Sequence, residues 1–224
     1  MEKKHIAIAI DGPVAAGKTT QAKLLAKELG FLYVDTGAMY RTLACYVTQL
    51  PKPEPSIDEV LAAVDMKVVR GAGGEQRMFL GDEDVTDQLR TPDISMAASR
   101  ISAEPKVREF LLEMQRQTAR ENDVVMEGRD IGTVILPDAQ VKVFLTADPC
   151  VRAERRHAEM QEKGSTIPYT EVLRDLRERD YNDSHREVAP LKAAHDAVLL
   201  DCTDLTVEET TQELLEIVRA TIGR

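Results

Sequence analysis

Residues 12–19, GPVAAGKT, constrain the fold of this chain more than any other part of the sequence. They match the pattern G-x-x-x-x-G-K-[ST], whose loop joins a buried strand to the helix that follows it. The apolar run HIAIAI at residues 5–10 precedes the motif, and residues 19–29 place apolar side chains at helical spacing. The alternative is a chance glycine turn with an exposed lysine. The flanking strand and helix patterns favour the phosphate-binding loop.

The residue types of this loop suit phosphate groups. Glycine lets the backbone curl so that its N–H groups point inward, and the start of a helix adds a positive dipole end. Lys18 can reach the β- and γ-phosphates of a nucleotide, and the Thr19 hydroxyl can ligate Mg²⁺. The candidate ATP-binding residues are Gly12, Pro13, Val14, Ala15, Ala16, Gly17, Lys18, Thr19 and Thr20.

Strand and helix patterns alternate along the chain. Besides residues 5–10, short apolar runs predict strands at residues 31–34, 124–126, 141–145 and 197–200. Helices are predicted over residues 19–29 and 37–50, from 149 toward 164, and from a capping box at Thr206 and Glu209. Five buried strands alternating with helices predict an α/β fold, with a five-stranded parallel sheet covered on both faces in three layers.

The stretch from about residue 64 to 90 breaks this alternation. Residues 66–70 and 77–80 are short strand-like runs, joined by GAGGEQ and followed by the turn GDED. This pattern is typical of an antiparallel hairpin. We therefore expect a single domain over residues 1–224 that carries a small antiparallel β insert. The pattern alone leaves open whether the insert is an edge hairpin or a substrate-binding element.

Composition excludes several kinds of partner. The 29 Lys and Arg stand against 39 Asp and Glu, and the net charge of −10 disfavours a general nucleic-acid coat. No apolar run approaches the roughly 20 residues of a membrane span, and no signal peptide is evident. The three cysteines lie far apart, which favours a reducing compartment. We expect a cytoplasmic protein with no membrane or nucleic-acid partner.

A phosphate loop by itself leaves the activity open. The base-reading N-K-x-D of GTPases is absent, and the chain is short for a large ATPase. Two classes remain: a small phosphotransferase, and a switch or assembly factor that binds ATP without a small-molecule acceptor. A second cluster of phosphate-binding residues would favour the phosphotransferase.

Such a cluster is present. Residues 35–41 and 127–130 follow the second and third predicted strands of the parallel sheet, so both lie at carboxyl ends, where open α/β sheets bind ligands. Two arginine-containing stripes have helical spacing: Arg179, Asp183 and Arg186, and Arg152, Arg155 and Arg156. Each stripe alone is also typical of a solvated helix face with ordinary salt bridges. Together with the phosphate loop, they favour a site that collects phosphates.

The chain resembles the bacterial-type cytidylate kinases of the nucleoside monophosphate kinase group. The resemblance rests on IDGPVAAGKTT, YVDTGAMYR, AASRISAEPKVRE, EGRDIGTV, KVFLTADP, RERDYNDSHREVAP and VLLDCTDLTVEE, which span essentially the whole chain. It implies transfer of the γ-phosphoryl group of ATP to CMP or dCMP, with Mg²⁺, by a P-loop fold acting as a monomer. It also implies an NMP-binding role for the insert and a helical lid at about residues 152–170.

The resemblance also implies roles for single residues. By this resemblance, the CMP phosphate is held by Arg41, Arg129 and Arg186, and the cytosine is read by Asp130, Ser99 and Arg108. The sugar is held by Asp183 and Arg179. The donor phosphates are faced by the stripe from Arg152 to Arg156. The expected catalytic residues are Lys18, Arg129, Arg156 and Arg179. The expected acceptor residues are Thr36, Tyr40, Arg41, Ser99, Arg108, Arg129, Asp130, Arg179, Asp183 and Arg186.

Two positions depart from the pattern of some relatives: Glu127 stands where they have Asp, and Thr36 where they have Ser. Another small P-loop kinase, acting on a different mononucleotide, dephospho-coenzyme A or shikimate, remains the alternative among enzymes.

Overall fold

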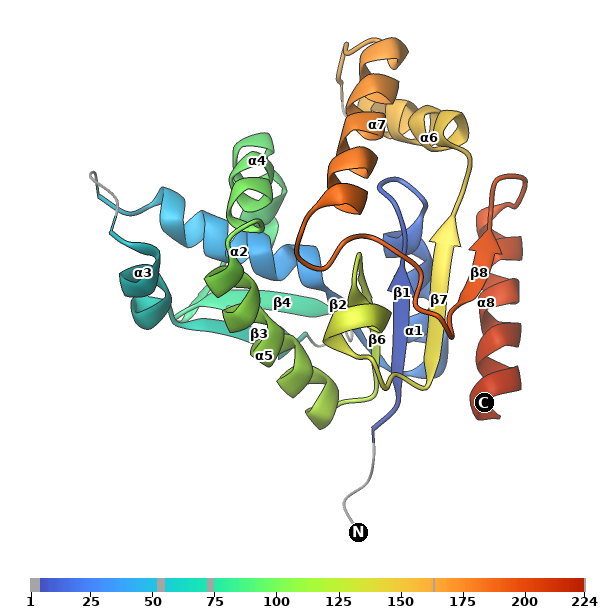
Figure 1. The fold of residues 1–224 in the computed structure, drawn as a ribbon, viewed down its shortest axis with the longest axis horizontal. Helices are drawn as coiled ribbons and strands as arrows, with labels where there is room; N and C mark the ends of the chain where they lie inside the picture. The colour runs from blue at the N-terminus through green and yellow to red at the C-terminus, as the bar shows by residue number, and fades with distance from the viewer. Residues whose placement is uncertain (1–4, 52–54, 72–74, 163, 224) are drawn as a thin grey trace. The chain divides into compact units, whose positions relative to one another are not determined.

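The computed structural model describes residues 5–51, 55–71, 75–162 and 164–223, and the side chains at positions 90, 92 and 99 lie outside this description. The chain divides into two compact units. One comprises Ala26–Met126 with the residues up to Ile6, and the other comprises Ala7–Leu25 with the residues from Glu127 onward. Figure 1 gives the element labels used below.

Two sheets form in the described part of the chain. The larger has five strands in the order β2-β6-β1-β7-β8: Leu32–Asp35, Val124–Gly128, Ala7–Asp11, Val141–Thr146 and Val198–Asp201. The smaller has three strands in the order β3-β4-β5: Met66–Arg70, Gln76–Leu80 and Glu83–Asp84. Strand β1 pairs with β7, and β7 with β8, both in parallel. The predicted α/β class with a five-stranded parallel sheet is confirmed.

Four strands of the larger sheet, β1, β2, β7 and β8, are each followed by an α-helix. The α-helices are α1 Lys18–Leu29, α2 Thr36–Thr48, α3 Ile57–Ala63, α4 Pro92–Ile101, α5 Pro105–Glu121, α6 Pro149–Glu162, α7 Tyr169–His185 and α8 Val207–Ile222. A 3₁₀ turn η1 spans Thr86–Arg90, and one turn of π-helix, η2, spans Ile131–Ile135. Helix α8 opens with the predicted capping box, in which Thr206 accepts from the backbone N–H of Glu209. Helices α3, α4 and α5 were not predicted.

The first unit contains the insert. Strands β3 and β4 pair antiparallel, as the hairpin pattern predicted, and the GDED turn adds the short strand β5. Helix α2 packs against α4 and against β4. Between α2 and α4 lie Ala44, Ala97 and Ala98, whose small side chains let the two helices approach closely. The element that carries the DTGAMYR motif is thereby fixed to the insert.

The second unit has its core around β1 and β7. Ile8 and Ile10 of β1, and Leu145 of β7, are fully buried, as expected for strands covered on both faces. Helix α8 lies along β7, and Leu214 and Val218 bury its apolar side (Figure 1). Helices α6 and α7 pack against each other. Among the described residues, no helix is long and apolar enough to cross a membrane.

Candidate active site

The loop between β1 and α1 has the backbone of a phosphate cradle. Gly12 and Gly17 have φ angles of +151° and +89°, and Ala15 has a φ of +58°. A Cβ at Gly12 would lie 2.0 Å from the backbone oxygen of Leu145, so a glycine is required there. Thr19 and Thr20 are exposed in the first turn of α1. The loop predicted from the motif is therefore formed between a strand and a helix, as expected.

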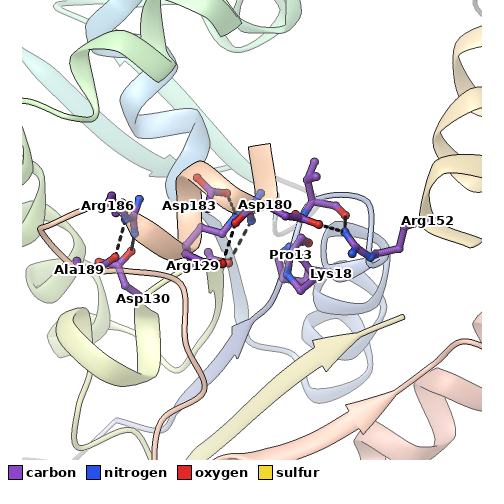
Figure 2. A network of polar contacts seen from close by, with 12 residues as sticks. Pro13, Lys18, Arg129, Asp130, Arg152, Asp180, Asp183, Arg186 and Ala189 are labelled. Carbon is purple, nitrogen blue, oxygen red and sulfur yellow. Dashed lines mark hydrogen bonds and ion pairs between the residues drawn. The ribbon is translucent and has the colours of Figure 1, made fainter. Parts of the chain in front are cut away.

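Lys18 lies inside this loop. Its side chain folds back, and Nζ donates to the carbonyl oxygen of Pro13 at 2.7 Å (Figure 2). The residue is only 5% exposed, and this burial, together with the charge of Arg129, lowers the pKa of its ammonium from 10.5 to about 7. The carboxylates of Glu127, Asp11 and Asp183 act in the opposite direction. A cation surrounded in this way is suited to bind phosphate oxygens.

Asp11 is a residue that sequence analysis missed. It ends β1, is 4% exposed, and accepts the backbone N–H groups of Ile131 and Gly132, both at 2.8 Å. Burial raises the pKa of its carboxyl group to about 6, although the two backbone hydrogen bonds lower it. Asp11 therefore fixes the backbone directly after Arg129 and Asp130. The available signal was a carboxylate that closes a buried apolar strand immediately before the loop.

Two arginine–carboxylate pairs connect residues 128–130, called the GRD segment below, to helix α7. Arg129 Nε donates to Asp183 at 2.8 Å, and Arg186 Nη2 donates to Asp130 at 3.1 Å (Figure 2). Arg186 also donates through Nε to the carbonyl oxygen of Ala189 at 2.6 Å. Four residues predicted for acceptor binding are thus brought together in one unit.

The stripe expected to face the donor phosphates divides into separate environments. Arg152 is buried and donates to Asp180 and to backbone oxygens of the second unit. Arg155 donates to the backbone oxygens of Cys202 and Thr203 at the end of β8. Arg156 is half exposed and pairs with Glu159 along α6. Of the three, Arg156 is the one whose guanidinium is held by a solvated partner and can turn toward a ligand.

Two further predicted residues belong to the same unit. Arg179 lies on α7, one helical turn before Asp183. Glu127 is 6% exposed at the end of β6, and its charge reaches Lys18, whose pKa it raises against the effect of burial. In the described part of the chain, no group of three His, Cys, Asp or Glu side chains could hold a metal ion.

The other predicted acceptor residues lie in the first unit. Asp35 caps α2 by accepting the N–H of Ala38, and its second oxygen accepts from Arg41 Nη2 at 2.7 Å. Arg41 Nε is buried with no hydrogen-bond partner among the described residues. Arg108 lies over the Tyr40 ring, with 5.9 Å from Cζ to the ring centroid.

Thr36 and Ser99 are the other predicted acceptor residues of the first unit. Thr36, the first residue of α2, is buried. The side chain of Ser99, on α4, lies outside the described part of the structure.

Gln76 of the insert is a second residue that sequence analysis missed. Its Oε1 accepts the backbone N–H of Asp35 at 2.5 Å, and its Nε2 donates to the carbonyl oxygen of the same residue at 3.3 Å. The side chain is 7% exposed. A buried amide from β4 therefore fixes the residue that both caps α2 and holds Arg41. Positions 35 and 76 meet only because β4 packs against β2, a strand of the other sheet, so the sequence carried no local signal.

Comparison with known proteins shows the family of this chain. A Cytidylate kinase family model matches residues 8–220. The cytidylate kinase of Caldicellulosiruptor saccharolyticus is 45% identical, covering 98% of this chain and 98% of its own. That of Fervidobacterium nodosum is 46% identical, covering 96% and 97%. A shikimate kinase structure from Acinetobacter baumannii aligns with a TM-score of 0.51, over 98% of this chain and 96% of its own. At 14% identity, this likeness shows the fold alone.

The fold is that of P-loop kinases, and the family model makes the chain a phosphotransferase of the nucleotide kinase class. The family match favours a cytidylate kinase over a kinase for a different mononucleotide, dephospho-coenzyme A or shikimate, and over a non-enzymatic switch. The chain belongs to the cytidylate kinase family, and its activity is the phosphorylation of CMP and dCMP.

Proposed function

We propose that the chain transfers the γ-phosphoryl group of Mg²⁺-ATP to the phosphate of CMP or dCMP through the residues described above. An oxygen of the CMP phosphate attacks the γ-phosphorus, the bond from that phosphorus to the β–γ bridging oxygen breaks, and ADP leaves with its electron pair. The attacking oxygen is already anionic at neutral pH, so no general base is required. Catalysis therefore consists of positioning and of neutralising the charge that spreads over the transferring group.

The observation that carries this proposal is the buried ammonium of Lys18 inside the strand–loop–helix cradle. In this role Lys18 contacts the transferring phosphoryl group. Arg129, Arg156 and Arg179 add positive charge around the phosphates. The carboxylate of Asp183 holds Arg129 at 2.8 Å and limits its rotamer freedom before the substrate binds.

A magnesium ion fits the donor set. Mg²⁺ in nucleotide sites takes one or two protein ligands together with phosphate oxygens and water. The exposed hydroxyl of Thr19 at the start of α1 would supply one ligand. The buried Glu127 carboxylate lies close enough to Lys18 to change its pKa. The ion supplies positive charge to the phosphates when it is bound. The Glu127 side chain would accept hydrogen bonds from waters bound to such an ion.

The acceptor phosphate is held by Arg41, Arg129 and Arg186. The buried Arg41 Nε, which lacks a partner among the described residues, supports this role because a phosphate oxygen would satisfy it. Tyr40 and Thr36 line the acceptor site beside Arg41. Asp183 and Arg179 hold the sugar.

Asp130, with Ser99 and Arg108, selects the base. Cytosine presents an amino donor at position 4, whereas uracil presents a carbonyl acceptor, and a carboxylate accepts from the first and repels the second. The Arg186 guanidinium at 3.1 Å holds Asp130 in place. A site built for a donor rejects the analogue that lacks it, because its own polar group is then buried unpaired.

An acceptor panel tests the proposed function. ADP release is measured with CMP, dCMP, UMP, AMP and shikimate, for the parent protein and for Asp130→Asn. We expect CMP and dCMP to be the preferred acceptors of the parent. In the variant, CMP turnover falls and the ratio of CMP to UMP activity moves toward unity. If the variant keeps the parent's preference, Asp130 does not select the base.

In this proposal the insert of β3–β5 serves the CMP side. A lid from about residue 152 to 170, in α6 and the start of α7, serves the ATP side.

The protein acts as a monomer in the cytoplasm, without nucleic-acid or membrane partners. Its three unpaired cysteines, Cys45, Cys150 and Cys202, support a reducing compartment. Sedimentation measurements with and without both substrates test the monomer.

A further inference from the structure

Helix α7 reaches both the GRD segment and the phosphate loop. Near its end, Asp183 accepts from Arg129, and the capping residue Arg186 donates to Asp130. One turn before Asp183 lies Asp180, whose carboxylate contacts the phosphate loop. Figure 2 shows these contacts in a row, from Arg186 to Asp180 and on to Arg152. One rigid element therefore carries contacts to the residues proposed for both substrates.

The contact to the loop involves both backbone polar groups of Val14, its N–H and its carbonyl oxygen. One oxygen of Asp180 accepts the N–H of Val14 at 3.3 Å, and the other accepts Nη1 of Arg152 at 2.7 Å. The same Nη1 donates to the carbonyl oxygen of Val14 at 2.9 Å, and Nε donates to that of Ala147. The Arg152 side chain is only 5% exposed. The ion pair from α6 and α7 thus holds Val14 from both sides.

The residue after Val14 explains why such a hold matters. Ala15 has a φ of +58°, a left-handed conformation that a residue with a Cβ adopts only where its surroundings fix it. The conformation at positions 14 and 15 decides where the following N–H groups of the loop point. Without the two contacts at Val14, this turn is free to relax into a conformation that aims those groups away from phosphate.

We propose that Arg152 and Asp180 are a positioning pair through which helix α7 sets the shape of the phosphate loop. The inference rests on the proposed function, because Asp183 and Arg186 of the same helix are proposed CMP contacts. CMP binding fixes the position of α7 through Asp183 and Arg186, and Asp180 passes this constraint on to Val14. ATP and CMP therefore favour each other's binding, and by thermodynamic linkage the factor is the same in both directions.

A purely structural role makes a different prediction. If the pair only joins α6 to α7, its loss lowers the melting temperature but leaves the coupling between the two nucleotides unchanged. The coupling factor, which is the ratio of the Kd of one ligand without and with the other, separates the two roles.

The experiment is calorimetric titration with Mg²⁺ and a non-hydrolysable ATP analogue, with and without saturating CMP. The parent is compared with Asp180→Asn, Arg152→Lys and the control Asp175→Asn, which changes a solvent-exposed carboxylate of the same helix. For the parent and the control, we expect CMP to tighten analogue binding at least about fivefold. In Asp180→Asn we expect the analogue alone to bind about tenfold more weakly, because a charge-assisted contact is lost. CMP affinity without the analogue stays within about threefold, and the coupling factor falls toward one.

Two results would overturn the inference: a parent coupling factor of one, or an unchanged factor in a folded Asp180→Asn. If that variant does not fold, Arg152→Lys decides, since lysine keeps the charge but cannot reach Asp180, Val14 and Ala147 together. A parent that binds the analogue but not CMP would instead contradict the proposed function. In that case, the affinity of Asp180→Asn for the analogue still tests whether the contacts of Asp180 and Arg152 to Val14 shape the phosphate loop.

Discussion

At the scale of single residues, we expect the largest loss of turnover from mutation of Lys18. Lys18→Ala removes the positive charge proposed to contact the transferring phosphoryl group, and loss of such a contact costs around 10²-fold or more in turnover. The fold should persist, because removal of a buried cation that is costly to desolvate leaves the strand and helix intact. We expect CMP phosphorylation to fall by at least that factor, with an unchanged circular dichroism spectrum. Near-parental turnover would contradict the phosphate-loop assignment.

The low pKa of Lys18 makes ATP binding depend on protons. Burial brings the pKa to about 7, and the phosphates of ATP favour the charged form and raise it again. At a pH of about 8.5 the amine is mostly neutral before binding, so ATP binding takes up close to one proton. Titration in two buffers with different ionisation enthalpies measures this uptake. Lys18→Met should abolish it, and equal uptake by the variant would assign the proton to another group.

Mutation of Arg186 distinguishes effects on the acceptor CMP from effects on the donor ATP. If Arg186 holds the CMP phosphate, Arg186→Ala raises the KM for CMP by about one to two decades, since a charge-assisted contact contributes about 1.5–3 kcal/mol. The KM for ATP changes little. Arg174→Ala is the matched control, because Arg174 lies on the same helix and pairs with Asp175 at the surface. An equal rise for both substrates would remove Arg186 from the acceptor site.

At the scale of elements, the insert acts on α2 through Gln76. Gln76→Ala deletes both hydrogen bonds to Asp35, which loosens the residue that caps α2 and holds Arg41. We expect the KM for CMP to rise about 3- to 30-fold, corresponding to one or two neutral hydrogen bonds, with the KM for ATP unchanged. Gln88→Ala, which changes an exposed amide just after the insert strands, serves as control. A parental KM for CMP in Gln76→Ala would confine the insert to a structural role.

How well each element could be predicted follows from how it is buried. Strands such as β1 and β7 are covered on both faces, so apart from Asp11 and Lys142 their sequences are mostly apolar and stand out. Helix α5 was missed because its buried face consists of Val107, Leu111, Gln115 and Thr118, two of which are polar. The buried positions of α5 recur at regular helical spacing, but apolar residues occupy only some of them, so the sequence shows no regular apolar pattern.

The candidate site likewise has a part that the sequence predicts and a part that only the fold reveals. The phosphate loop could be predicted because its glycines, lysine and threonine are adjacent in sequence. The hold of Asp11 on Ile131 and Gly132, and that of Asp180 on Val14, join positions more than a hundred residues apart. The residues of the GRD segment were expected at the site, but only the fold reveals that Arg129 meets Asp183 while Asp130 meets Arg186.

At the scale of the whole molecule, Asp11 links stability to pH. Its pKa in the folded protein is about 6, above the ordinary value of 3.8, so between these values the folded state binds more protons than the unfolded state. The contribution of this group to the free energy of unfolding therefore falls as the pH rises from about 4 to 6, by up to roughly 3 kcal/mol. Asp11→Asn lacks this fall.

Urea unfolding of the two proteins across this pH range measures the difference. The gap in unfolding free energy between parent and Asp11→Asn should shift in favour of the variant as the pH rises. Asp123→Asn, which changes a carboxylate that accepts from the backbone of Ile6, is the control. A pH-independent gap would mean that Asp11 is ionised throughout this range.

The two glycines of the phosphate loop are written alike in the motif, yet they resist mutation for different reasons. A methyl group at Gly12 would overlap the main chain of β7, whereas one at Gly17 meets nothing within 4 Å and is opposed only by its positive φ. In a library of variants sorted once for soluble expression and once for growth that requires the enzyme, Gly12→Ala disappears from both pools. Gly17→Ala survives the first sort and fails the second. An inherited change at Gly12 would thus deplete the protein from the cell, while one at Gly17 would leave it abundant and inactive.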